Sequence, residues 1–167
     1  MTEYLTHKQI KQLEALTKAP RDKLLIRTQY ETGCTVSELV NLKREDLKNH
    51  SIHVNNRTCY VSKELLEELD HYLQRHKSRY VFTSRQNNQL TTKRVQQITK
   101  QLIQQVDSSI QKPTPHILRY SHIVHAAQQQ IPLNNIMQQT GLAEQRISQV
   151  LTQALDSEDQ AYTRLFS

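Results

Sequence analysis

The chain has 167 residues, a length that allows one domain with a buried core. Its mean hydropathy is −0.72, and no apolar run approaches the roughly 20 residues that a membrane span needs. Residues 1–11 show no hydrophobic signal segment. The two cysteines, Cys34 and Cys59, are too few for a disulfide framework. These features predict a soluble, cytoplasmic protein that does not engage a membrane.

The charge balance favours an anionic partner. Lys and Arg total 22 and Asp and Glu total 16, which gives a net charge of +6. A basic domain of this size is typical of nucleic-acid binding, although many basic proteins bind none. Only Gly33 and Gly141 are glycines, so a glycine-rich phosphate loop is excluded. The chain has no Trp and 5% aromatic residues, which argues against base stacking as the main binding mode.

The first third of the chain predicts three helices. Thr6 with Gln9 forms a capping-box pattern ahead of apolar residues at helical spacing. Pro20 ends that helix and starts another, which continues to Gly33, a residue suited to a left-handed helix stop. A short helix is expected over 36–42.

The hydrophobic period then changes. Residues 51–54 and 57–61 alternate and are rich in β-formers, and Asn55-Asn56 between them predicts a tight hairpin turn. Ser62 is a candidate cap for a helix over 63–76. Residues 80–83 form a short extended piece.

The remainder is predicted to be helical. The expected helices cover 92–106, capped by Thr91 or Thr92, then 116–129, 132–141, 143–155 and 158–166. The predicted fold is therefore mainly α with a small β-hairpin, of the α+β class. We expect a single domain over 1–167 in which residues 156–167 form a C-terminal tail helix.

Two local features carry chemistry. His116 and Arg119 lie three residues apart on one helical face, where they could grip a phosphodiester, although a surface pair is the simpler interpretation. His122 and His125 extend this region, but no Cys or carboxylate is spaced to complete a metal site, so no metal is predicted.

Basic residues also gather in groups, and each group alone is typical of a solvated face. Several such groups in one small domain favour a surface for DNA. The residues predicted to contact it are Lys43, Arg44, Lys48, Arg57, Arg85, Lys93, Arg94 and Arg119.

In order and spacing, the chain resembles the catalytic domain of tyrosine recombinases, the phage integrase family. The resemblance begins with the segment 32–39, Thr-Gly-Cys-Thr-Val-Ser-Glu-Leu, which is similar to the first-arginine box. It continues through the hairpin and the segment 81–95. Residues 115–121, Pro-His-Ile-Leu-Arg-Tyr-Ser, resemble the HxLRH[ST] box, and Ile136 with Gly141 resembles the segment before the second histidine. The resemblance covers nearly the whole chain.

The resemblance implies a specific chemistry. In this family two arginines hold the scissile phosphate, a hairpin lysine and a histidine serve proton transfers, and a second His or Trp adds a hydrogen bond. A tyrosine attacks to give a 3′-phosphotyrosine link, and no metal or cofactor is needed. The cationic cradle matters because negative charge builds up on the phosphoryl oxygens in the transition state.

Only part of this machinery carries over. His116 and Arg119 match the family, but Thr35 stands at the first-arginine position. The hairpin turn carries no lysine at its tip, and Arg57 is the nearest cation. Leu142 stands where His or Trp is expected, and Leu151 stands at the nucleophile position. Leucine has no nucleophilic atom.

Three hypotheses follow. The first is a protein associated with site-specific recombination or integration that binds duplex DNA, is impaired in strand cleavage, and acts as a binder or accessory to an intact recombinase. The second is an active breaking-and-rejoining enzyme that uses Tyr162 as nucleophile, in its own site or a neighbour's. The third is a helical interaction module without a DNA role, which packs through the tail as a homo-oligomer or on a partner. An N-terminal arm domain is not expected.

Overall fold

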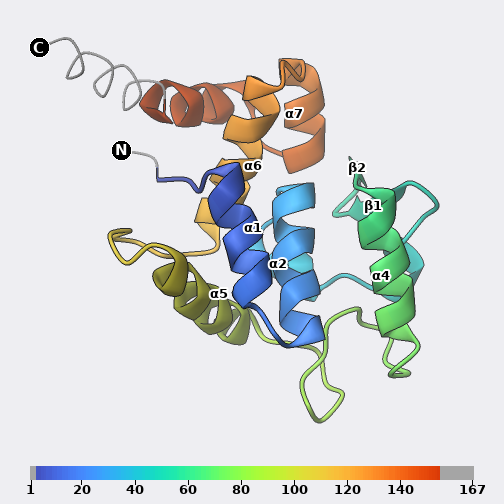
Figure 1. Cartoon of the computed structure of the whole chain (residues 1–167). Helices are drawn as coiled ribbons and strands as arrows, with labels where there is room; N and C mark the ends of the chain where they lie inside the picture. The colour runs from blue at the N-terminus through green and yellow to red at the C-terminus, as the bar shows by residue number, and fades with distance from the viewer. Residues whose placement is uncertain (1–2, 155–167) are drawn as a thin grey trace, which may run out of the picture.

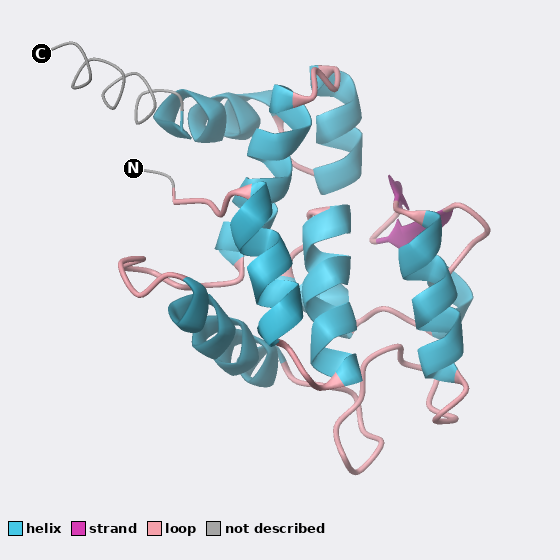
Figure 2. Ribbon diagram, in the orientation of Figure 1, coloured by secondary structure: helices cyan, strands magenta, loops and turns pink. Residues whose placement is uncertain are grey.

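The computed structural model describes residues 3–154 as a helical assembly with one β-hairpin (Figure 1 and Figure 2). The N-terminal half contains α1 (His7–Leu16), α2 (Pro20–Thr32), α3 (Val36–Val40), the 3₁₀ turn η1 (Arg44–Asp46), β1 (Ser51–Val54) and β2 (Arg57–Tyr60). The chain continues with α4 (Lys63–Leu73), α5 (Thr92–Val106), α6 (His116–Gln128) and α7 (Leu133–Thr140), followed by a helix over 144–154. The predicted α+β class is confirmed. The predicted helix over 158–166 lies outside the described residues.

The predicted helix boundaries rest on capping groups that the structure confirms. The Thr6 hydroxyl accepts the Gln9 amide at 3.2 Å, and the Gln9 side chain accepts the Thr6 amide at 2.9 Å. Thr91, one of the two candidates, caps α5. Gly33 and Gly141 end α2 and α7 with φ of +66° and +74°, in the left-handed region that favours glycine.

One helix ends earlier than its hydrophobic pattern predicts. The stripe predicts a helix to residue 76, but α4 ends at Leu73. Arg44, from η1, donates its guanidinium hydrogens to the backbone oxygens of Leu73 and Ser78, at 2.9 and 2.5 Å, and to that of His76. These contacts satisfy carbonyls at the end of the helix, where the chain turns away. A side chain 29 residues earlier therefore sets this boundary.

The hairpin places a cation directly after its turn. β1 and β2 pair antiparallel, with Ser51 opposite Tyr60 and Val54 opposite Arg57. The two turn residues, Asn55 and Asn56, have φ of +43° and +65°, as a two-residue hairpin loop requires. The pairing of β1 with β2 therefore fixes the direction in which the Arg57 side chain leaves the strand.

The apolar residues form two clusters. The larger one lies among α1 to α5, the hairpin and the start of α6, and includes Leu25, Leu39 and Phe82. The smaller one lies among α6, α7 and the helix over 144–154, and includes Ile123 and Ile147. Within residues 3–154, no helix has the length and apolar character to cross a membrane.

Gln139 of α7 joins the smaller cluster to the hairpin. Its side-chain oxygen accepts the Tyr60 amide at 2.9 Å, and its side-chain nitrogen donates to the Tyr60 and Glu31 carbonyls at 2.8 and 3.0 Å. The Gln139 side-chain amide thus makes the two hydrogen bonds to the Tyr60 backbone that a neighbouring strand would make. Because this contact fixes the end of α7, it also fixes Gly141 beside the hairpin.

A buried arginine joins three helices. The guanidinium of Arg27 on α2 is 8% exposed and lies within 4 Å of carboxylates on α1, α2 and α4. Those carboxylates belong to Glu14, Glu31, Glu64 and Glu68, and the shortest contact is 2.8 Å, to Glu68. Arg27 is therefore the shared counter-ion of several carboxylates. Burial raises the pKa of Glu14, while the Arg27 charge lowers it.

Replacing Arg27 with Met should destabilise the fold at neutral pH by about 3 kcal/mol, because the acids lose their counter-ion. The loss of stability in the variant should become smaller towards pH 4, since protonation of the unpaired carboxylates then favours the native state. Chemical denaturation over this pH range measures both effects. The control Lys63→Met removes only an exposed pair with Glu67 and should change stability by less than about 0.5 kcal/mol. Equal losses in the two variants would contradict this role for Arg27.

Candidate active site

The end of α2 brings three helices to one point. A Cβ atom at Gly33 would lie 3.0 Å from Thr140 Cγ2 and 3.1 Å from His122 Cδ2. Glycine therefore allows α2 to approach α6 and α7 closely, as well as turning the chain. The chain then enters α3 through Thr35, at the predicted first-arginine position.

Thr35 serves as a helix cap in this structure. Its hydroxyl accepts the Glu38 amide at 3.2 Å, and Glu38 Oε1 accepts the Thr35 amide at 2.9 Å. This reciprocal pair satisfies two backbone donors at the start of α3. The side chain is thus committed to the backbone, and it supplies no positive charge to the site.

Glu38 binds Arg57 through two parallel hydrogen bonds. Arg57 Nη1 lies 2.6 Å from Glu38 Oε2, and Nη2 lies 2.9 Å from Oε1. The two side chains are 11% and 13% exposed. Burial raises the pKa of Glu38, but the hydrogen bonds from Arg57 and Thr35 outweigh it and lower that pKa to about 2. The carboxylate is therefore held in its charged form.

Gly141 closes the other side of this pair. Arg57 Nε donates to the Gln139 carbonyl at 3.0 Å. A Cβ atom at Gly141 would lie 2.8 Å from Arg57 Nη1. The glycine therefore provides the space in which the Arg57 guanidinium lies, between α3 and the end of α7.

Arg119 of α6 also contacts the end of α7. Its Nη2 donates to the Thr140 carbonyl at 2.5 Å. Its Nε is buried and has no hydrogen-bond partner among the described residues. Burial lowers the pKa of Arg119, the Glu38 carboxylate raises it and the Arg57 charge lowers it. Two guanidinium groups and one carboxylate thus share one site.

The other predicted site residues lie on α6 and in the segment that follows α7. His116 is the exposed first residue of α6, and its ring stacks on Tyr120 with centroids 6.0 Å apart. Leu142 follows Gly141, and both Leu142 and Leu151 pack in the smaller apolar cluster with Tyr120. Arg146 Nη2 donates to the Tyr120 hydroxyl at 2.9 Å. Tyr162 lies outside the described residues.

The predicted DNA-contacting cations differ in how accessible they are. Lys48, Arg85, Lys93 and Arg94 are exposed, and Lys43 and Arg119 are half-buried. Arg44 and Arg57 bind protein groups instead, at the end of α4 and at Glu38. Sequence reasoning missed Glu38 and Gln139 as parts of the site. The Thr35-x-x-Glu38 capping box was visible as a signal, but nothing in the sequence pairs Arg57 with residues 19 and 82 positions away.

Among residues 3–154, no group of three or more His, Cys, Asp or Glu side chains could hold a metal ion.

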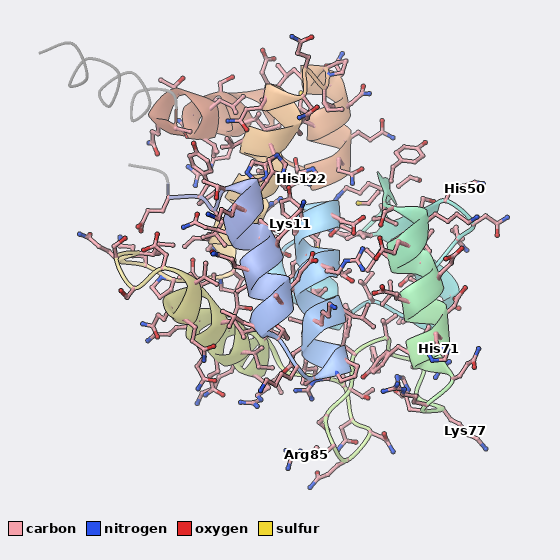
Figure 3. The ribbon with its side chains drawn as sticks, in the orientation of Figure 1. Lys11, His50, His71, Lys77, Arg85 and His122 are labelled. Carbon is pink, nitrogen blue, oxygen red and sulfur yellow. The ribbon has the colours of Figure 1, made fainter. Side chains whose placement is uncertain are left out.

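The two histidines that follow Arg119 hold helices together. His122 Nδ1 lies 2.8 Å from the Tyr30 carbonyl, and Figure 3 shows His122 near the upper ends of α1 and α2. His125 Nδ1 lies 2.6 Å from the Tyr30 hydroxyl, and its ring stacks on His7 at 3.8 Å.

Comparison with known proteins assigns the family. The model of the phage integrase family matches residues 3–158. The tyrosine recombinase XerA of Pyrococcus horikoshii is 30% identical over 161 residues, which cover 89% of this chain and 55% of the relative. The tyrosine recombinase XerD of Listeria innocua is 30% identical over 149 residues, covering 79% and 50%. The chain belongs to the phage integrase family.

Solved structures agree on the fold. The crystal structure of XerA recombinase superposes with a TM-score of 0.82 at 23% identity, covering 97% of this chain and 64% of that one. XerH site-specific recombinase bound to its difH substrate gives a TM-score of 0.77 at 19% identity, covering 91% and 50%. The fold is that of tyrosine recombinase catalytic domains. The chain spans about half the length of the curated relatives it matches.

Replacing Glu38 with Gln should destabilise the protein by about 3 kcal/mol at neutral pH, because Arg57 loses its buried partner. A carboxylate with a lowered pKa stabilises the fold above its ordinary pKa of 4.5, and this contribution is lost as the pH falls towards 2. The difference between wild type and variant should therefore close over that range in denaturation experiments. The control Glu45→Gln, at an exposed position, should show no such convergence. A constant difference would contradict the pairing.

His125 should make the fold sensitive to acid. Burial and the neighbouring His7 and His122 together lower its pKa to about 4, against the backbone hydrogen bond to Leu5. His125 is therefore protonated at a higher pH in the unfolded chain than in the native state. The free energy of unfolding then falls as the pH drops from about 6.5 to 4. In His7→Ala, which removes one of the groups that lower this pKa, the His125 ring resonances should titrate at higher pH in NMR spectra. An unchanged titration would contradict this assignment.

Proposed function

We propose that this protein binds duplex DNA with the recombinase-type fold, in the context of site-specific recombination or integration, and is impaired in strand cleavage. The observation that carries the proposal is the Arg119 guanidinium, which is half-buried, donates to the Thr140 carbonyl at the end of α7 and forms no ion pair with a described residue. A half-buried cation without an anionic partner is costly unless a ligand pairs with it. A phosphodiester oxygen has the charge and geometry to do so.

Charge supports a DNA backbone as the ligand. Lys48, Lys93 and Arg94 are exposed, and the chain has a net charge of +6. Phosphate neutralisation supplies most of the affinity of such surfaces for DNA. Solved neighbours of this fold include XerH bound to difH and lambda integrase bound to a COC′ core site. The second is a structural likeness with a TM-score of 0.71.

Three replacements support impaired cleavage. Thr35 caps α3 where the family places an arginine, and Leu142 and Leu151 pack in an apolar cluster. Leucine at the nucleophile position removes the covalent step, and the loss of one preorganised donor alone costs roughly 10²–10³ in rate. Such a protein would occupy sites as an accessory or competitor of an intact recombinase. Pairing through residues 156–167 stays a prediction, because that segment lies outside the described residues.

Arg119→Gln should weaken binding to duplex DNA and reduce the slope of log K against log salt by about one. A salt series by fluorescence anisotropy measures both quantities. Lys63→Gln on α4, an exposed charge that pairs with Glu67, is the matched control for charge loss. Failure of the wild type to bind any duplex at low salt would overturn the proposal.

Cleavage is tested separately with nicked duplexes and denaturing electrophoresis. The proposal predicts no covalent protein–DNA band. A band that appears with wild type and disappears in Tyr162→Phe would overturn the impaired-cleavage part and establish Tyr162 as nucleophile. The DNA-binding part would stand in that case.

A further inference from the structure

A cleft at the opposite end of α2 from Gly33 gathers arginines from four segments. Its volume is about 660 Å³, and it lies between the start of α2, the end of α4, the loop before α5 and the first turn of α5. Figure 1 shows these segments together at the lower edge of the molecule. The arginines that line the cleft are Arg21, Arg75, Arg85 and Arg94.

Most of this positive charge lacks an internal partner. Arg21 Nε pairs with Asp22 at 2.9 Å, and its Nη1 donates to the Thr83 carbonyl at 3.2 Å. The side chains of Arg75, Arg85 and Arg94 are exposed and form no ion pair with any residue between 3 and 154. Asp22 is the only carboxylate that lines the cleft within the described residues, and Arg21 already occupies it. The side chains of Arg75, Arg85 and Arg94 thus line one cleft, with no carboxylate among the described residues to neutralise them.

The walls of the cleft suit an anion that also has an apolar part. Pro20 and Leu90 line it, together with the half-buried ring of Tyr72. His76 also lines it, and burial lowers the pKa of this imidazole. The residue before Pro20, Ala19, makes no side-chain cap to α2, so the positive end of the helix dipole adds to the arginine charge.

The cleft is separate from the Arg57 and Arg119 site. The 13 residues of α2 lie between the two, which is about 20 Å at 1.5 Å per residue. Figure 3 likewise shows Arg85 at the lower tip of the molecule and His122 near its upper part. A single phosphate cannot reach both. About six base pairs of B-DNA, with a rise of about 3.4 Å each along the helix axis, would span this distance.

We propose that this arginine cleft is a second anion site, which binds a phosphate group through Arg75, Arg85 and Arg94. The phosphate belongs either to the backbone of a duplex or to a small phosphorylated ligand. In the first case the inference rests on the proposed function and extends it. The forked geometry of arginine suits phosphate oxygens in both cases.

The test uses the full chain and the double variant Arg75→Gln/Arg94→Gln. The matched control is Lys8→Gln/Lys11→Gln, which removes two exposed charges on α1. The first arm measures the thermal unfolding midpoint against inorganic phosphate and against a mononucleotide, at constant ionic strength. A ligand that binds only the native state raises this midpoint. The second arm measures the slope of log K against log salt for duplex DNA.

A midpoint that rises with phosphate or nucleotide in wild type and control, but not in the cleft variant, supports the site. A DNA salt slope lower by about two in the cleft variant, and less altered in the control, identifies the backbone as its source. An unchanged slope with a lost phosphate response identifies a small ligand. Equal responses of all three proteins in both arms would overturn the cleft. If wild type binds no DNA, the proposed function fails and the first arm alone decides.

Discussion

The bidentate pair between Glu38 and Arg57 is the constraint on which the site depends. It joins the first turn of α3 to the hairpin, and through the Gln139 carbonyl it joins both to the end of α7. Burial of an ion pair is unfavourable unless every donor is satisfied. Here the carboxylate also accepts the Thr35 amide, and Gly141 leaves room for the guanidinium. Each contact therefore requires the others to be in place.

This pair also sets the electrostatics of the site. The Glu38 carboxylate raises the pKa of Arg119 and the Arg57 charge lowers it, so the two arginines and the carboxylate influence one another. In the proposed DNA complex, a phosphodiester would meet an Arg119 guanidinium that the Thr140 carbonyl already orients. Thr35, Leu142 and Leu151 supply neither charge nor a nucleophile. The proposed function is therefore to hold a phosphate rather than to attack it.

The sequence predicts the local structure well wherever a short-range signal controls it. Thr6, Thr91, Gly33 and the Asn55-Asn56 turn each act through neighbours within a few residues, and their predicted effects are confirmed. The end of α4 could not be predicted, since it depends on Arg44 from an earlier turn. The same reason explains why Arg57 looks like a free surface cation in the sequence. Its partners lie 19 and 82 residues away, and only the fold brings them together.

The most direct test of the account is the ¹⁵N–¹H spectrum of the arginine Nε–H groups during titration with duplex DNA. A saturable shift of the Arg119 Nε–H signal is expected, because a phosphate that pairs with the Arg119 guanidinium changes the surroundings of its buried Nε–H. That shift should occur without formation of a covalent adduct. An Arg119 signal that stays fixed while the exposed arginines respond would contradict the account, since the DNA would then bind elsewhere on the surface.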